Sequence, residues 1–230
     1  MTNFRITVTS DTVCPWCYVG RRQLQRAQQL WLQKHPDGGD TFSVTYAPYQ
    51  LQPQWPRGPA ASIDKQQFYE ERFGLERTEM MHRRLLQVGQ QTGIDFKFGG
   101  RVGSSRDSHR LVQLAKTHGN EVELKTIDAL FAAYFEHERD ITAYETLRDV
   151  AVKAGIPADE FQRAIIDSDA GGPEVDKAAE AARQGGINGV PDYQVQGRFR
   201  LNGARDPTEF VRVFEKVKAL ERGGQVSDEE

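Results

Sequence analysis

Hydrophobic and polar residues alternate at the start of the chain. Between residues 4 and 9 apolar and polar side chains take turns, a period of two that predicts a β-strand. Over residues 15–35 small or apolar side chains recur every three to four positions, as on one face of an amphipathic helix. Residues 42–47 alternate again and predict a second strand, which ends at Pro48. This order predicts a βαβ unit with parallel strands.

The middle of the chain has a helical pattern throughout. It begins after a proline-rich stretch at residues 52–59 and continues for more than a hundred residues. Asn120 is followed three residues later by Glu123, so we expect a helix to begin there with a capping box. The aromatic stripe at 131–135 has helical spacing and is expected in the core. We therefore predict an all-helical insertion at residues 61–170.

Mixed patterns return after Pro173. An alanine-rich helical repeat ends at Gly185, and alternating residues at 193–201 predict a β-hairpin. A last amphipathic helix is expected to begin near Pro207. The predicted organisation is a first part of an α/β domain, 1–60, the helical insertion, 61–170, the second part of that domain, 171–222, and a disordered tail, 223–230.

Composition narrows the range of functions. The 230 residues carry a net charge of −3 with charges of both signs interspersed, whereas a nucleic-acid or membrane-surface protein would carry a basic patch. No apolar run approaches the roughly 18 residues of a membrane span, and the N-terminus lacks the apolar core of a signal peptide. We therefore expect a cytoplasmic protein without nucleic-acid or membrane partners, in which any disulfide is transient.

The candidate chemistry lies in the motif Cys14-Pro15-Trp16-Cys17, which holds both cysteines of the chain. It joins the first predicted strand to the first predicted helix, where free N–H groups and the helix dipole stabilise a thiolate. Helical spacing places Cys17 on the apolar face, while Cys14 is expected at the accessible helix mouth. Cys14 is therefore the predicted nucleophile and Cys17 the resolving thiol. Helix-mouth thiols have pKa values of roughly 3.5 to 7, against about 8.5 for a free cysteine.

Two other interpretations of the cysteine pair are weaker. A structural zinc site needs four ligands, and the sequence has no second cysteine pair and no paired histidines, so we expect no metal. The pair could also be two inert thiols, but the strand–helix junction favours redox chemistry. Four histidines, at positions 35, 82, 118 and 137, lie at helix ends or among charges and are expected in solvent.

Five short stretches, spread over nearly the whole chain, form a recognisable combination. They are Ser10–Gly20, Ser108–Leu111, Leu130–Phe135, Gly189–Pro191 and Asn202–Ala204. This combination resembles the DsbA-like family, and most closely its FrnE-like branch, which is grouped with 2-hydroxychromene-2-carboxylate isomerases. The resemblance implies a thioredoxin fold, with a central mixed β-sheet flanked by helices and a large helical insertion.

The resemblance also implies further site residues. Pro191 is expected to be cis and to lie beside the cysteines, with the backbone of Val190 turned towards an extended substrate. Pro15 and Trp16 are expected to contact the substrate. His109 has two interpretations: it faces Cys14 and assists proton transfer, or it is an ordinary residue in the first turn of a helix. Asp192 departs from the family, which usually has an aromatic or apolar residue there.

These features together predict a thiol–disulfide oxidoreductase that works through a mixed disulfide. The expected partners are proteins or peptides with disulfides or dithiols, or a small molecule. The protein itself is expected to be a monomer or a homodimer. No tightly bound cofactor is expected, although glutathione is a candidate co-substrate or reductant. The main alternative is a glutathione-dependent isomerase or transferase for a small aromatic or polyketide-like substrate, but such relatives usually have serine at the position of Cys14. A third alternative is a chaperone or binding module that uses the groove around Pro191.

Overall fold

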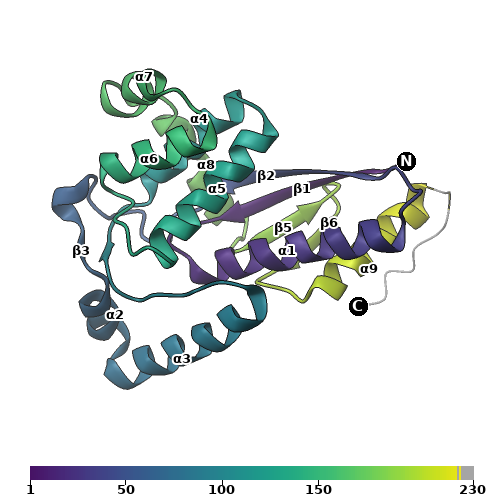
Figure 1. Cartoon of the computed structure of the whole chain (residues 1–230), viewed down its shortest axis with the longest axis horizontal. Coiled ribbons are helices and arrows are strands. Elements are labelled where there is room, and N and C mark those ends of the chain that lie inside the picture. The colour runs from purple at the N-terminus through teal and green to yellow at the C-terminus, as the bar shows by residue number, and fades with distance from the viewer. Residues whose placement is uncertain (222, 224–230) are drawn as a thin grey trace.

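A mixed β-sheet forms the centre of the computed structural model, which describes residues 1–221 and 223. In this described part, the sheet has four strands in the order β2-β1-β5-β6 (Figure 1). The strands β1 (Asn3–Ser10) and β2 (Thr41–Pro48) are parallel, as the βαβ pattern predicts. The predicted hairpin, β5 (Asp192–Val195) and β6 (Phe199–Asn202), pairs antiparallel with β1 through β5. The expected thioredoxin-type mixed sheet is confirmed.

Two long helices pack together against this sheet. They are α1 (Pro15–Lys34) and α9 (Pro207–Glu221). The ring of Phe4 on β1 lies 5.2 Å from that of Trp31 on α1 and 4.9 Å from that of Phe214 on α9, measured between centroids. All three side chains are buried. The apolar positions that predict these helices therefore form the core, and burial of these aromatic side chains is the main force that holds the layers together.

The carboxylate of Asp40 ties both helices to the start of the sheet. It accepts hydrogen bonds from the backbone N–H of Thr2 at 2.8 Å and from Trp31 Nε1 at 3.0 Å, and it pairs with the ammonium of Lys218 on α9. Burial alone would raise the pKa of Asp40, but the lysine and the two N–H donors outweigh it and hold the pKa below its usual value.

Substituting Asp40→Asn should therefore lower stability in a pH-dependent way. We expect a loss of about 1–3 kcal/mol in the free energy of unfolding at pH 7, because buried donors lose a charged acceptor. A carboxylate with a depressed pKa stabilises the fold above its unfolded pKa of about 3.9 and loses this effect as the pH falls through its lower folded value. Urea unfolding of both proteins between pH 3 and pH 7 should thus show the difference shrinking below about pH 4. A difference that is independent of pH would contradict this role.

The predicted insertion is rich in helices and lies in the sequence between the sheet strands β2 and β5. It also contains two strands of two residues each, β3 and β4, which pair antiparallel and are too short to leave a period in the sequence. The helix α2, at residues 65–73, lies within the predicted helical stretch. The elements between β2 and β5 are a 3₁₀ turn (Pro59–Ala61), β3 (Ile63–Asp64), α2 (Lys65–Phe73), α3 (Leu75–Thr92), β4 (Arg101–Val102), α4 (Arg106–Thr117), α5 (Asn120–Phe135), α6 (Tyr144–Ala154), α7 (Ala158–Phe161), a π-helical turn (Gln162–Ile166) and α8 (Gly172–Gln184).

Figure 1 shows α2 and α3 at the end of the molecule opposite the N-terminus. They stand apart from the cluster of α4 to α8, and α3 lies against the start of α1. The buried aromatic stripe of α5 confirms the prediction for residues 131–135 and joins the insertion to the main hydrophobic core. The predicted disordered tail, 223–230, lies outside the described residues except for Gly223.

The predicted capping box of α5 is wrong. Gly119 is the N-cap and makes no side-chain bond. Asn120 instead donates from Nδ2 to the carbonyl of Val44 at 2.6 Å, and Glu123 accepts from the backbone N–H of Tyr46 at 2.6 Å. Both backbone groups belong to β2, which is an edge strand. The two side chains therefore satisfy the exposed edge of the sheet rather than their own helix, because an open edge has unpaired donors and acceptors.

None of the described helices is both long enough and apolar enough to cross a lipid bilayer.

Candidate active site

The two cysteines lie at the junction between β1 and α1. Cys14 is the N-cap of α1 and Pro15 occupies the first turn. The N–H of Cys14 donates to the carbonyl of Asp11 at 3.1 Å, and the N–H of Cys17 donates to the carbonyl of Cys14 at 3.1 Å. These bonds form two consecutive tight turns, which bring the two sulfur atoms to one side of the helix start. Both cysteines are free thiols.

Burial distinguishes the two thiols less than the sequence predicts. Cys17 is buried, as expected from its helical face, and burial together with the hydrogen bond to Cys14 raises the pKa of its thiol. Cys14, however, is only 4 % exposed, so the prediction of an accessible helix mouth is wrong. The reason lies far away in the sequence, because α2 and α3 of the insertion form a roof over the helix start. Cys14 is reached through the cavity beneath that roof.

The loop before β5 faces Cys14. The peptide bond between Val190 and Pro191 is cis, as the family resemblance implies. Cys14 Sγ lies 3.6 Å from the carbonyl oxygen of Val190, within reach of a weak S–H···O bond. The family departure at Asp192 is compensated locally, since its buried carboxylate accepts a hydrogen bond of 2.8 Å from Nε of Arg200 on the paired strand. The hairpin therefore holds the loop so that its backbone stays next to Cys14.

A cavity of about 300 Å³ lies directly over Cys14. Its walls come from the start of α1, the loop after β2, the helices α2 and α3, the loop before β4, the end of α5 and the loop before Pro191. Most of its surface is apolar or aromatic, and no aspartate or glutamate is among the described residues that line it. The lining residues are Val13, Cys14, Pro15, Trp16, Leu51, Lys65, Tyr69, Met81, His82, Leu85, Lys97, Phe98, Phe135, Gly189 and Val190.

Lys65 is a buried base in the wall of this cavity. Its ammonium donates to the carbonyl of Tyr134 at 3.1 Å and lies 3.8 Å from the centroid of the Tyr134 ring. Burial lowers the pKa of Lys65 to about 8. The ring and the carbonyl stabilise the charged form only in part, because neither carries a full negative charge. Sequence reasoning missed this residue, since a lysine at the start of a helix has no pattern that predicts burial.

The stability of the protein should reveal this shifted lysine. Between about pH 8 and pH 10.4 the unfolded chain binds a proton at Lys65 more strongly than the folded chain, so wild-type stability should rise with pH over that interval. The variant Lys65→Met lacks this proton. In urea unfolding at pH 7, 8, 9 and 10, the free energy of unfolding of the wild type is therefore expected to increase relative to that of Lys65→Met as the pH rises. A constant gap between the two proteins over this range would contradict the shift.

Two further groups in the wall can exchange hydrogen bonds with a ligand. Burial raises the pKa of Tyr69 to about 12, so its hydroxyl remains a donor at neutral pH. His82 was expected in solvent, and this prediction is wrong. Its ring stacks on Phe98 with a centroid separation of 3.8 Å, and burial lowers its pKa, which favours the neutral ring. Neither position shows a pattern in the sequence, because both reach the site by the packing of the insertion.

His109 does not line the cavity. It is buried, and its Nε2 lies 2.9 Å from the carbonyl oxygen of Tyr49 and 3.3 Å from Oδ1 of Asp11. Asp11 also accepts the backbone N–H of Leu51 at 2.7 Å. This network joins Asp11, which follows β1 and lies three residues before Cys14, to the loop after β2. The geometry therefore favours a positioning role for His109 over the predicted role in which it faces Cys14, in the substrate pocket, and assists proton transfer.

A four-stranded sheet of this order, a C-x-x-C dithiol at the start of α1 and a cis-proline loop facing it define a protein of the thioredoxin-fold class. A family model described as the DSBA-like thioredoxin domain matches residues 5–215. The chain belongs to this family. No curated protein matches the sequence.

Solved structures share the fold over nearly the whole chain. A probable DsbA oxidoreductase from Streptomyces coelicolor is 24 % identical, with a TM-score of 0.81 over 99 % of this chain and 93 % of its own. A 2-hydroxychromene-2-carboxylate isomerase is 14 % identical, with a TM-score of 0.66 over 95 % and 98 %. The cytosolic disulfide reductase DsbM from Pseudomonas aeruginosa, solved with GSH, is 16 % identical, with a TM-score of 0.59 over 93 % and 98 %. At these identities the likeness concerns the fold.

Proposed function

We propose that the protein is a thiol–disulfide oxidoreductase. The observation that carries the proposal is the placement of Cys14, the N-cap of α1, against the carbonyl oxygen of Val190 at 3.6 Å with Cys17 buried one turn behind it. The N-terminus of a helix stabilises an anionic sulfur, and the adjacent loop offers a backbone edge to an extended substrate. The Cys14 thiol is thus placed to attack a substrate, and the Cys17 thiol is placed to resolve the mixed disulfide.

The chemistry follows from that difference. The Cys14 thiolate attacks one sulfur of a substrate disulfide and displaces the other sulfur as a thiolate, which takes up a proton. Cys17 then loses its proton and attacks the sulfur of Cys14, which releases the second substrate thiol and leaves a Cys14–Cys17 disulfide. Two electrons have passed from the protein to the substrate. The reverse sequence oxidises a substrate dithiol. Pro15 and Trp16 border the reacting sulfur and contact the substrate.

The expected substrates are proteins, peptides or small molecules that contain disulfides or dithiols. Glutathione is proposed as a co-substrate or as the reductant that restores the dithiol, and the DsbM structure named above was solved with GSH. We further propose a cytoplasmic location and a monomeric or homodimeric state. These proposals rest on the dithiol and on the interspersed surface charge.

A second function is favoured by the cavity. A largely apolar cavity of about 300 Å³ with Lys65, Tyr69 and His82 in its walls suits a small ligand, as a glutathione-dependent isomerase or transferase would require. The presence of a second cysteine favours the redox function, because an isomerase needs no resolving thiol.

One assay separates the two functions. The protein, supplied with dithiothreitol, is expected to accelerate the reduction of insulin, and in redox buffers its two thiols should convert together to an intramolecular disulfide that alkylation and mass spectrometry detect. If the protein leaves disulfides untouched and its thiols do not pair, while it binds glutathione or an aromatic ligand, the isomerase or transferase function takes precedence.

A further inference from the structure

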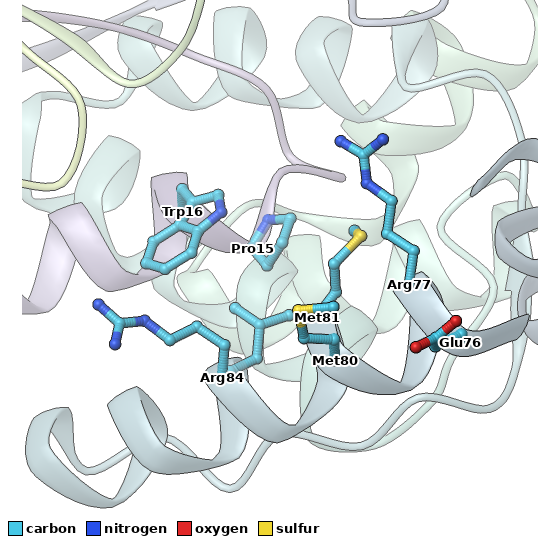
Figure 2. Close-up of a pocket in the computed structure, with 8 residues that line it drawn as sticks. Pro15, Trp16, Glu76, Arg77, Met80, Met81 and Arg84 are labelled. Carbon is cyan, nitrogen blue, oxygen red and sulfur yellow. The ribbon is translucent and has the colours of Figure 1, made fainter. Parts of the chain in front are cut away.

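A second, open depression adjoins the roof on its outer side. It has a volume of about 510 Å³ and lies between α3 and the first turn of α1. Figure 2 shows Met80 and Met81 along the α3 wall, with Pro15 and Trp16 across from them. Trp16 is 38 % exposed and Met80 is 56 % exposed, so this surface presents large apolar side chains to solvent. We call it the α3 groove.

Arginines stand at both ends of the α3 groove. Figure 2 shows Arg77 at one end and Arg84 at the other, below Trp16. On α3 the ion pair among described residues joins Arg83 to Glu79, while Arg77 and Arg84 make none. Glu76 also lines the groove, at the Arg77 end, so the net charge of the lining is still positive. Two guanidinium groups that form no salt bridge with a described residue and flank exposed methionines are complementary to an apolar segment with acidic residues.

Helix geometry sets the spacing of those acidic residues. Arg77 and Arg84 are seven residues apart, two turns of helix, which corresponds to about 10 Å along the axis. Side chains of an extended peptide alternate between its two faces, and the chain advances about 3.3 Å per residue, so two acidic side chains on the face towards α3 lie two or four positions apart. A spacing of four positions, about 13 Å, leaves room for apolar residues between the two flexible arginine side chains. We infer that the α3 groove binds an extended segment of the substrate in which two acidic residues, four positions apart, flank an apolar stretch that packs on Met80 and Trp16.

The groove is continuous with the catalytic cavity. Four of its lining residues, Pro15, Trp16, Met81 and Leu85, also line the space over Cys14. A segment bound in the groove would thus place a neighbouring cysteine at the entrance of that space. The inference rests on the proposed oxidoreductase function and names its substrate class: an acidic, apolar polypeptide segment next to a cysteine.

The test uses three short peptides that differ only in the two charged positions. Each carries its cysteine as a mixed disulfide with thionitrobenzoate, three leucines between the charged positions, and aspartate, asparagine or lysine at those positions. Reduced protein is mixed with each peptide, and release of coloured thionitrobenzoate gives the rate constant of the first exchange step. We expect wild-type protein to react about tenfold or more faster with the aspartate peptide than with the lysine peptide, and added salt should reduce the ratio.

Matched variants locate the effect. The double substitution Arg77→Glu and Arg84→Glu should reverse the order, so that the lysine peptide reacts faster. Arg83→Glu makes the same kind of charge change on α3 outside the groove and should keep the wild-type order. All three arginines are exposed, and circular dichroism checks that the variants fold. The inference is overturned if the three peptides react equally, or if Arg83→Glu reverses the order as well.

A small uncharged disulfide, 2-hydroxyethyl disulfide, separates this inference from the function it depends on. If the wild type reacts with it but shows no preference among the peptides, the oxidoreductase function stands and the α3 groove inference fails. If the wild type reacts with neither the small disulfide nor any peptide, both fail.

Discussion

Replacing Cys14 with serine is expected to reduce disulfide exchange by at least about 10³-fold, because the hydroxyl of serine does not ionise at neutral pH and cannot replace a thiolate nucleophile. Replacing Cys17 with serine should have a different result. Cys14 still attacks, but nothing within the protein resolves the product, so a covalent complex with the substrate should accumulate. Non-reducing electrophoresis and mass spectrometry after acid quenching would show the adduct.

Access to the cavity, rather than the degree of burial, determines which of the two variants should trap substrate. Cys14 lines the cavity and Cys17 does not. Burial also raises the pKa of Cys17, which keeps it a thiol until the mixed disulfide brings a reactive sulfur to it. The double variant with serine at both positions is the control and should be inert. Trapping of substrate by Cys14→Ser, with none by Cys17→Ser, would reverse the assigned roles.

Local patterns in the sequence predict most of the elements near the cysteines. Alternation and helical periodicity locate β1, α1, β2 and the hairpin because each buries one side of a regular element. The cis-proline is different, since no periodicity distinguishes a cis bond from a trans bond, and only the family resemblance predicts it at Pro191. The dithiol itself is visible because the chain has two cysteines.

The parts of the site that the sequence does not reveal are contributed over long distances. Lys65, Tyr69 and His82 approach Cys14 from a segment about fifty to seventy residues further on, and they do so because α2 and α3 fold back over the helix start. The same roof buries Cys14 against the prediction. Asn120 does not cap its own helix. Its side chain instead donates to the backbone of β2, an edge strand whose backbone groups would otherwise be unpaired. In each case a tertiary contact outweighs a local preference.

The roof also has a consequence for substrate choice. Because Cys14 lines a cavity of about 300 Å³, we expect a folded protein substrate to reach the sulfur through an extended segment. The cavity and the α3 groove meet at Pro15 and Trp16, so the C-x-x-C motif itself forms the boundary between the space for the reacting sulfur and the outer surface. This position supports the proposed contact of these two residues with the substrate.

The closest packing at the site occurs behind the cysteines, at Gly20 on α1. A Cβ at this position would overlap the hydroxyl of Tyr193 and lie 2.9 Å from Cγ of Pro191. In an ordinary helix, replacing glycine with alanine stabilises by about 1 kcal/mol. Here we expect Gly20→Ala to lower the free energy of unfolding by about 1–3 kcal/mol instead, because overpacking of a buried site outweighs the helix preference. Urea unfolding would measure the loss.

Gly189, two residues before Pro191, provides the matched control for stability. A Cβ there meets no atom within 4 Å, so Gly189→Ala should leave the free energy of unfolding nearly unchanged. Gly20→Ala should in addition slow disulfide exchange, since any shift of Pro191 moves the carbonyl of Val190 that lies 3.6 Å from Cys14. A stabilised Gly20→Ala variant with full activity would show that α1 and the proline loop are not packed as closely as the structure has them. The glycine therefore sets how near the loop can approach the helix, and through the loop it sets the surroundings of the reacting sulfur.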